Sequence, residues 1–399
     1  MPPSPLRVSV ASLQRDPLTV LEKLAVTARP LGTLACLVGR QRVVLVTDPS
    51  LVRELLVERS TAFGKQNVID PRGRPLDARA AETPAEHAAG RRTIQPAVTS
   101  ERIDAMGALS ARLVAREADG WRDAETVDLG LLARSVAARV ASEIAVGRAL
   151  EVENVVEDFL ASFSLVATRL PLRASIRAVR RARRGMSAYT ELCSAVAEAG
   201  SSDVAPQSVL GLMLAAGRPR EEAEQKAFGV LLAGIPTSAS LLQWALVLLA
   251  TEPSLRAGIA AGDVDARGIV GEALRLYPPS WYIARRALEP AGLGAERFAV
   301  GDIALVSPYL QHRDPAVFPD PLRVDPGRFA TGDPDGFIPF GLGPRRCLGE
   351  RLAWAESLAC VRTLASRFSF QLPAGVTIRP EASATLRPAG GLRLTVATI

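Results

Sequence analysis

The stretch Phe340–Gly349 reads Phe-Gly-Leu-Gly-Pro-Arg-Arg-Cys-Leu-Gly and places one cysteine between a glycine-rich loop and a segment with helical spacing of apolar residues, Leu348–Ala359. A helix N-terminus offers free N–H groups and partial positive charge, and both favour the thiolate form of a nearby cysteine. The three glycines let the backbone turn tightly and approach a flat ligand. The pattern therefore predicts a reactive Cys347 thiolate beside a flat ligand, with Arg345 placed to pair with an acidic group on it.

The other three cysteines, Cys36, Cys193 and Cys360, are flanked by apolar or helical residues, and we expect them to be structural. No Cys-x-x-Cys pair occurs, and the chain has only two histidines. These counts argue against a zinc site, a disulfide framework and a histidine-rich metal centre.

The loop resembles the haem-binding loop of the cytochrome P450 superfamily, Phe-x-x-Gly-x-Arg-x-Cys-x-Gly, and every defined position is present. The resemblance implies a P450 fold, mainly α with a smaller β part, in which residues 1–399 form a single haem-thiolate domain. It implies haem b (iron protoporphyrin IX) as cofactor and Cys347 as the iron ligand. The residues that it places around the haem from this loop are Phe340, Gly341, Arg345 and Gly349.

A second motif, Glu272-Ala273-Leu274-Arg275, resembles the family's Glu-x-x-Arg helix, and Pro326–Phe329 resembles the segment that supplies a further arginine, Arg328. The resemblance makes Glu272, Arg275 and Arg328 a buried ion network behind the haem loop. Glu and Arg at i, i+3 share a helix face, and a buried carboxylate needs charged or hydrogen-bonded partners. Glu272 precedes Cys347 by 75 residues.

The two haem carboxylates must be neutralised if they are buried. The resemblance gives four candidates for this role, namely His87, Arg91, Arg285 and Arg345. His87 and Arg91 are four residues apart and so share a helix face. An exposed helix histidine remains the alternative for His87, and Arg92 and Arg286 are alternatives in register. We interpret His312 as a structural turn residue.

The segment Ala233–Ser238 resembles the oxygen-binding stretch of the family's long central helix. The resemblance places Ala233 and Gly234 beside the haem, with Gly234 leaving room for O₂, and Thr237 and Ser238 in the proton chemistry. A hydroxyl bonded back to its own helix is the alternative for Thr237. Many family members carry an acid directly before the threonine, whereas this chain has Pro236, which supplies no proton and no N–H and should kink the helix.

Substrate-contacting positions are placed by analogy alone. They are the loop Gln66–Thr83, the stretch Ser164–Ala174, Trp281 and Ile283 on the strand that carries Arg285, and Ala389 in the turn 388–390. Aromatic residues make up only 5% of the chain, which faintly favours an aliphatic substrate.

Outside these motifs, the short apolar runs 34–38 and 43–46 predict the two strands of a β-hairpin. A helix is predicted to follow as far as about Glu58, with Asp48 or Ser50 as its N-cap. Helical periodicity dominates about 86–275, with a break at 199–202. The 23 uncharged residues Phe228–Ala250 are interpreted as a buried core helix, although their length could span a bilayer. Strands such as Ile303–Val306 and a helix over about 348–368 follow.

Composition is that of a folded soluble chain, with 48% hydrophobic and 23% charged residues and a net charge of +6. The N-terminus lacks an apolar signal segment, which predicts a cytoplasmic protein without a membrane anchor. The basic run Arg177–Arg184 lacks interleaved aromatics, so we interpret it as a solvated helix face and expect no nucleic-acid partner.

The resemblance implies a monomeric monooxygenase that oxidises a small apolar molecule with O₂, as soluble bacterial members do in secondary metabolism. Electrons come from a separate ferredoxin and ferredoxin reductase, and we expect an acidic ferredoxin to dock near Arg91, Arg92 and Arg346. Two other functions stay open at this point. One is an atypical reaction, with peroxide or a rearrangement or coupling, motivated by Pro236. The other is a non-catalytic haem- or ligand-binding protein.

Overall fold

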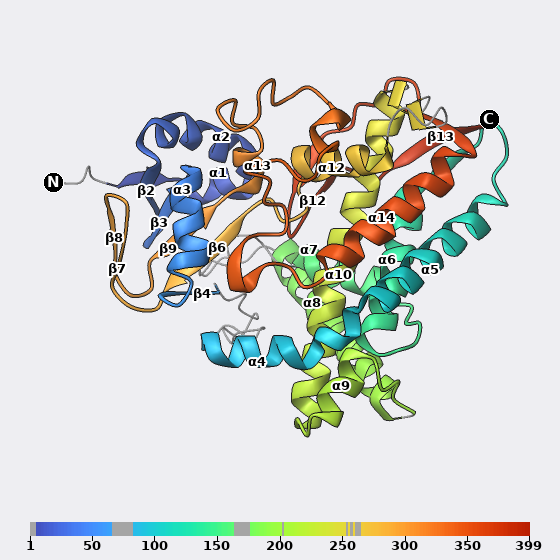
Figure 1. Cartoon of the computed structure of the whole chain (residues 1–399), viewed down its shortest axis with the longest axis horizontal. Helices are drawn as coiled ribbons and strands as arrows, with labels where there is room; N and C mark the ends of the chain where they lie inside the picture. The colour runs from blue at the N-terminus through green and yellow to red at the C-terminus, as the bar shows by residue number, and fades with distance from the viewer. Residues whose placement is uncertain are drawn as a thin grey trace.

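The computed structural model describes residues 5–65, 83–162, 176–201, 203–252, 254–255, 258–259 and 265–399. Figure 1 shows strands and short helices from both ends of the chain on the left, and long helices on the right, with the termini at opposite sides. The predicted loop Gln66–Thr83 and stretch Ser164–Ala174 fall outside the described residues, apart from Thr83.

Helices dominate the described chain. The α-helices are α1 (Val10–Arg15), α2 (Pro17–Ala28), α3 (Pro49–Arg53), α4 (Pro84–Ile94), α5 (Ser100–Ala118), α6 (Leu129–Ala145), α7 (Glu153–Ser162), α8 (Ile176–Ser201), α9 (Val209–Ala215), α10 (Arg220–Thr251), α12 (Ala266–Leu276), α13 (Pro308–Gln311) and α14 (Glu350–Ala365). Shorter turns of helix are η1 (Arg29–Leu31), η2 (Glu54–Glu58), η4 (Gln95–Val98), η5 (Pro326–Phe329) and η6 (Gly343–Arg345).

The main sheet joins the two ends of the sequence. Its strand order is β1-β2-β3-β9-β6-β4, formed by β1 (Leu6–Val8), β2 (Thr33–Val38), β3 (Gln41–Val46), β4 (Phe63–Lys65), β6 (Ile283–Ala287) and β9 (Ile303–Val306). The smaller sheets comprise β5 (Thr126–Asp128), β7 (Ala291–Leu293), β8 (Glu296–Phe298), β10 (Phe368–Gln371), β11 (Pro380–Ala382), β12 (Leu386–Pro388) and β13 (Arg393–Thr398).

Several elements form where the local sequence predicts them. The hairpin is antiparallel β2–β3, with Thr33 opposite Val46. Asp48 caps α3 by accepting hydrogen bonds from the N–H groups of Ser50 and Leu51, as capping carboxylates do. The mainly α fold with a smaller β part is confirmed.

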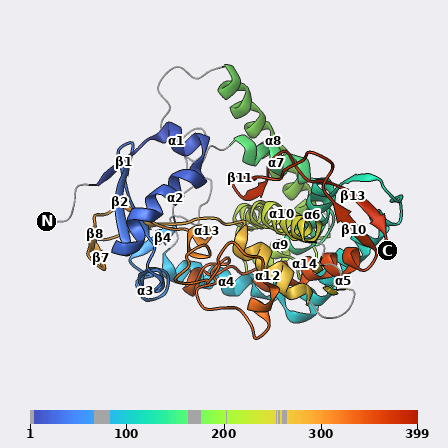
Figure 2. The ribbon, with the colours of Figure 1, turned by 90° about the horizontal axis from the view of Figure 1, so that it is seen from above.

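The uncharged segment lies inside α10, the long helix at the centre of the helical side of the molecule. Figure 2 shows α10 close to end-on, with α6, α9, α12 and α14 around it. Its residues Leu241–Leu249 are all buried, and Trp244 donates from Nε1 to the Leu386 carbonyl at 2.8 Å. By length and composition α10 could cross a membrane, but 61% of its most apolar window is buried in the protein, which confirms the core-helix interpretation.

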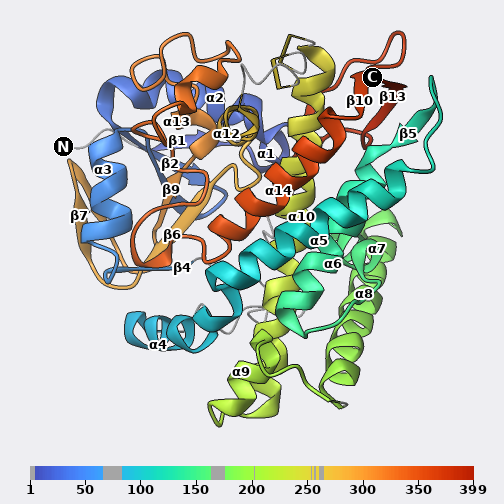
Figure 3. The ribbon, with the colours of Figure 1, turned by 45° about the vertical axis from the view of Figure 1, so that its right-hand side comes forward.

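Two helix boundaries differ from expectation, and the kink expected at Pro236 stays a prediction. Helix α8 continues through Gly200 to Ser201, because the Gly200 carbonyl accepts a hydrogen bond from Arg220 instead of ending a helix in solvent. The last long helix begins at Glu350 and ends at Ala365, inside the predicted range. Helix α10 continues through Pro236 as one helix. Figure 3 shows α14 and α5 running side by side.

Candidate functional site

Cys347 lies in the loop between η6 and α14, and its N–H donates to the Phe340 carbonyl at 2.9 Å. Two glycines shape this loop, since Gly341 and Gly343 both have φ of +72°, a region that glycine adopts at little cost. A Cβ at Gly343 would lie 2.2 Å from the Leu56 carbonyl oxygen. Only glycine therefore lets the loop pack against η2 and present Cys347.

The surroundings of the Cys347 thiol differ from the expectation of a lowered pKa. Burial raises the pKa of this thiol and Glu350 adds to the rise, whereas the Gly349 N–H, Arg91 and Arg346 lower it. The prediction of a lowered thiol pKa was wrong because α14 begins only at Glu350, three residues beyond the cysteine. The effect of burial, which raises the pKa, is therefore larger than that of the helix N-terminus, which lowers it. Cys347 nevertheless has solvent-accessible surface. The sulfur is therefore reachable by a ligand.

The middle of α10 has one open side. Ala233 is exposed, and Thr237 and Ser238 are half-buried, although the helix is otherwise a core element. The Thr237 hydroxyl donates to the Ala233 carbonyl at 2.6 Å and lies 3.3 Å from the Gly234 carbonyl. The bond back to its own helix, the alternative weighed for Thr237, is therefore what this structure has.

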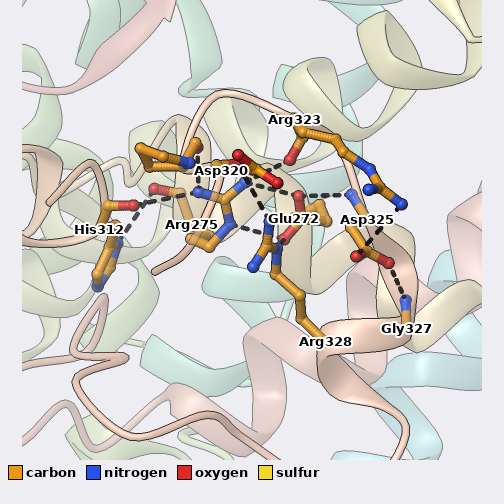
Figure 4. A network of polar contacts seen from close by, with 9 residues as sticks. Glu272, Arg275, His312, Asp320, Arg323, Asp325, Gly327 and Arg328 are labelled. Carbon is orange, nitrogen blue, oxygen red and sulfur yellow. Dashed lines mark hydrogen bonds and ion pairs between the residues drawn. The ribbon is translucent and has the colours of Figure 1, made fainter. Parts of the chain in front are cut away.

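Arg275 and Glu272 form a fully buried pair at the C-terminal end of α12 (Figure 4). Arg275 donates from Nε and Nη2 to the two Glu272 carboxylate oxygens, both at 2.7 Å. Its remaining N–H groups donate to three backbone carbonyls, those of His312 at 3.1 Å, Pro321 at 2.5 Å and Arg323 at 3.0 Å. All five guanidinium donors are used, which is the full capacity of an arginine.

Arg328 completes this cluster from η5 but holds it less tightly. Its Nε lies 3.8 Å from Glu272 Oε1, too far for a hydrogen bond, and its Nη2 donates to the Asp320 carbonyl at 3.1 Å. The Asp325 N–H donates to Glu272 Oε2 at 3.0 Å. The structure thus brings together the three residues of the predicted ion network, with Arg275 making the direct contacts.

Two of the candidate arginines, Arg285 on β6 and Arg345 on η6, lie close enough for their charges to interact. Burial and the neighbouring charge of Arg345 lower the pKa of Arg285 to about 10. Within the described ranges no carboxylate forms an ion pair with Arg285. Its neighbour Arg286 points the other way, with Nη1 near Gly301. Of the two, Arg285 is the one that faces Arg345.

Helix α4 brings Arg91 to the cysteine loop. Arg91 donates from Nη1 to the Arg346 carbonyl at 2.5 Å, one residue before Cys347. The next residue, Arg92, is exposed, and His87 is half-buried one turn before Arg91. The structure therefore favours Arg91 over Arg92 as the residue that reaches the loop.

Comparison with known proteins places the chain in a family. Residues 266–396 match the family model described as cytochrome P450. Cyclooctatin synthase of Streptomyces melanosporofaciens is 28% identical, over 89% of this chain and 86% of that protein. Crystallised CYP175A1 from Thermus thermophilus superposes with a TM-score of 0.78 at 28% identity, covering 98% of this chain and 100% of that one. The chain belongs to the cytochrome P450 superfamily. It is an oxidoreductase of the monooxygenase class.

A second relative bears on the reaction class. Cyclooctat-9-en-7-ol 5-monooxygenase, also from S. melanosporofaciens, is 28% identical over 89% of this P450 and 88% of that protein. A six-coordinated cytochrome P450 from another strain of T. thermophilus gives a TM-score of 0.77 at 27% identity, covering 98% of this chain and 99% of that one.

The family implies a haem held by a cysteine thiolate, and the residues of this P450 fit such a group. Cys347 offers an exposed sulfur, and exposed Ala233 leaves one side of the central helix open. Arg285 and Arg345 bring two positive charges together at a buried position, which suits a ligand that carries carboxylates. These roles stay predictions that rest on the arrangement of the side chains.

A Cβ at Gly234 would lie 3.3 Å from the Ala141 side chain, so α6 packs closely against this glycine, and its role beside O₂ stays a prediction. The sequence-based placement of Trp281 needs correction. Trp281 is 3% exposed and donates to the Ser383 carbonyl at 3.1 Å, which makes it a core residue instead of a pocket residue. It also precedes β6, so the expected alternation with Ile283 and Arg285 does not reach it.

The other two pocket candidates lie on the elements expected for them, and their contact with substrate stays a prediction. Ile283 is half-buried against the main-sheet core, and its Cδ1 is the atom nearest to where a Cβ on Gly341 would stand. It borders the cysteine loop. Ala389 is exposed in a turn, with its N–H donating to the Arg379 carbonyl at 2.9 Å.

Sequence reasoning missed one buried acid beside the α10 site. Glu356, on α14, is 3% exposed, and the Ser238 hydroxyl hydrogen-bonds its carboxylate. Burial raises the pKa of Glu356 to about 7, and the Ser238 bond opposes that rise. The two residues are far apart in the sequence, so no local pattern reports their contact.

The pKa of Glu356 has a consequence for stability. The folded carboxyl binds its proton more tightly than an unfolded one, so ionisation penalises the fold increasingly as the pH rises from about 4.5 to 7, and fully above 7. Glu356→Gln removes this penalty. The difference in free energy of unfolding, variant minus wild type, is therefore expected to rise by about 3 kcal/mol when the pH is raised from 4 to 9.

Denaturant titrations at several pH values measure this difference. Glu117→Gln, a change at an exposed carboxylate on α5, serves as the control. A wild type and Glu356→Gln variant with parallel pH profiles would show that Glu356 ionises normally.

Proposed function

We propose that this P450 hydroxylates a small apolar molecule of secondary metabolism, using haem b, O₂ and electrons from a separate ferredoxin and ferredoxin reductase. Residues 1–399 act as one haem-thiolate domain, a cytoplasmic monomer. The observation that carries the proposal is the exposed Cys347 just before α14, together with exposed Ala233 on α10, two helices that Ser238 and Glu356 join by a hydrogen bond. The names of the two Streptomyces relatives support a secondary metabolite as substrate.

On the cysteine side, the protein holds the ligand atom and tunes its charge. The Gly349 N–H hydrogen-bonds to the sulfur, and Arg91 and Arg346 add positive charge nearby, so all three stabilise a thiolate once it forms. Bound haem with a thiolate ligand supplies O₂ activation and favours O–O cleavage. Arg285 and Arg345 are the residues that would hold the haem carboxylates.

On the α10 side, the protein must deliver protons. The Thr237 hydroxyl donates its hydrogen bond to the Ala233 carbonyl, so toward any other group its oxygen can act only as an acceptor. Pro236 has no proton to give. Glu356 holds a proton near neutral pH and is bonded to Ser238, directly after Thr237. We assign to Glu356 the acid function that position 236 lacks, acting through Ser238 and water.

This assignment predicts how the use of electrons changes in variants. General acid assistance is typically worth roughly 10²–10⁴-fold in rate. Glu356→Gln is expected to lower the product formed per NAD(P)H consumed and to raise peroxide release, whereas Thr237→Ala is expected to have the smaller effect. Assays with a substrate found by haem spin-state shift and a surrogate redox system measure both quantities. Tight coupling in Glu356→Gln together with a large loss in Thr237→Ala would contradict the assignment.

Pro236 also favours a second candidate, a reaction driven by peroxide or a rearrangement or coupling. Turnover with hydrogen peroxide in place of O₂ and the reductase system distinguishes the two. Faster product formation with peroxide than with O₂ and donors would favour this candidate over the hydroxylation.

Electron donors are expected to approach the face that carries Arg91, Arg92 and Arg346. Arg346 is exposed but forms a two-contact ion pair with Glu350, with both distances 2.5 Å. Arg92 is therefore the more available charge for an acidic ferredoxin, and encounter through it weakens with salt.

A further inference from the structure

His312 is a fully buried titratable side chain that the proposed chemistry does not use. Its exposure is 0%, and it follows α13. Nδ1 lies 3.1 Å from the Arg275 carbonyl oxygen, and Nε2 accepts a hydrogen bond from the Ile338 N–H at 2.9 Å. The second contact fixes the neutral tautomer, with the proton on Nδ1 donated to Arg275. Burial lowers the pKa of His312 to about 3, so the ring is neutral at physiological pH.

The two bonds connect different parts of the site. Arg275 belongs to the buried ion network, whereas Ile338 lies two residues before Phe340. The Gly341 N–H donates to the Ile338 carbonyl at 3.0 Å, and the Cys347 N–H donates to the Phe340 carbonyl at 2.9 Å. A short series of backbone bonds thus leads from His312 to the cysteine.

Neighbouring contacts hold the same segment. The Phe337 ring stacks on His312 at a centroid distance of 5.3 Å and an interplanar angle of 28°. Gln311, the last residue of α13, donates to the Gly336 carbonyl at 2.9 Å. Gln311 and His312, at the end of α13, therefore contact three successive residues, 336–338, of the segment that leads into the cysteine loop.

We propose that His312 is the positioning residue of the Cys347 loop, coupling the loop to the Glu272–Arg275 pair through its bond to the Ile338 N–H. This inference rests on the proposed role of Cys347 as iron ligand. The hydrogen bond to the Arg275 carbonyl holds the imidazole ring in place, and the hydrogen bond from the Ile338 N–H fixes the position of the segment that leads into the loop. Loss of the second bond is expected to reduce thiolate ligation even where the fold survives.

Two isosteric substitutions separate the bonds. His312→Gln places an amide where Nε2 stood and keeps an acceptor for Ile338, whereas His312→Asn places its amide where Nδ1 stood and keeps only the donor to Arg275. Each variant leaves one buried backbone group unpaired, so their losses of stability should be similar.

The readout is the CO complex of the reduced holoenzyme. In His312→Asn the ratio of thiolate-type to non-thiolate absorption is expected to fall about tenfold below that of His312→Gln, the equivalent of roughly 1.4 kcal/mol. Unfolding temperatures of the two variants, measured alongside, should agree. Equal ratios, or equal failure of both variants to fold, would overturn the proposal.

A measurement on the wild type decides the bonds independently. The chain has only two histidines, so ¹⁵N-histidine labelling gives two imidazole spectra, and His87→Gln assigns them. His312 is expected to carry its proton on Nδ1 and not to titrate between pH 8 and 5; a proton on Nε2 would overturn the proposal. If the CO complex of the wild type showed no thiolate band, the proposed role of Cys347 would be wrong. The ¹⁵N-histidine spectrum would still test the two hydrogen bonds of His312.

Discussion

Cys347→Ala is expected to abolish the red-shifted absorption band of the reduced, CO-bound protein completely, because this band requires a thiolate on the iron. The other cysteines are less accessible, since Cys36 and Cys360 are buried in core clusters and Cys193 is half-buried, whereas Cys347 is exposed. The measurement is a CO difference spectrum of the purified variant.

The matched controls are the alanine variants of the other cysteines. Cys36→Ala, Cys193→Ala and Cys360→Ala should keep the band, with at most a loss of stability from the missing side chain. Loss of the band in Cys360→Ala alone would show that the wrong cysteine has been assigned.

Arg275→Lys is expected to be the most destabilising conservative change in the protein. Lysine has three donors in place of five and cannot hold both Glu272 oxygens in the planar geometry of a guanidinium. The change leaves buried carbonyls and a buried carboxylate without full partners. Breaking such a pair costs about 3–5 kcal/mol, a large part of a typical free energy of unfolding.

Denaturant unfolding of the expressed protein measures this loss, and failure to accumulate as a folded protein would be its extreme form. Arg328→Lys is the matched control in the same cluster, because its Nε makes no hydrogen bond to Glu272 and the side chain is 14% exposed. A loss in Arg328→Lys as large as that in Arg275→Lys would mean that the cluster is held by its total charge and not by the five directed bonds.

The sequence predicted those features of the molecule that depend on a short, continuous sequence motif. The cysteine loop and the Glu272–Arg275 spacing each depend on residues close together in the sequence, and the uncharged central helix is one continuous run of 23 residues. The structure brings the first two into the site as expected, with Arg328 beside them, and places the third in the core.

Predictions failed where the answer depends on what packs against an element from elsewhere. Trp281 is buried by a cluster that includes Leu18 and Leu386, which its own neighbours in sequence do not reveal. The contact of Ser238 with Glu356 joins α10 to α14 in the same way. Periodicity tells which face of an element is apolar, but not which element covers it.

The order of strands in the main sheet has a consequence for biosynthesis. β3 ends at Val46, and its parallel partner β9 begins at Ile303, so 257 residues must be made before the pair can form. At roughly 5–20 residues per second, the edge of β3 waits about 13–50 s without this partner. An unpaired edge of Val43–Val46 is a template for association with other chains. Cys347 emerges from the ribosome only after that interval, so the edge of β3 is exposed to other chains before the proposed iron ligand has been made.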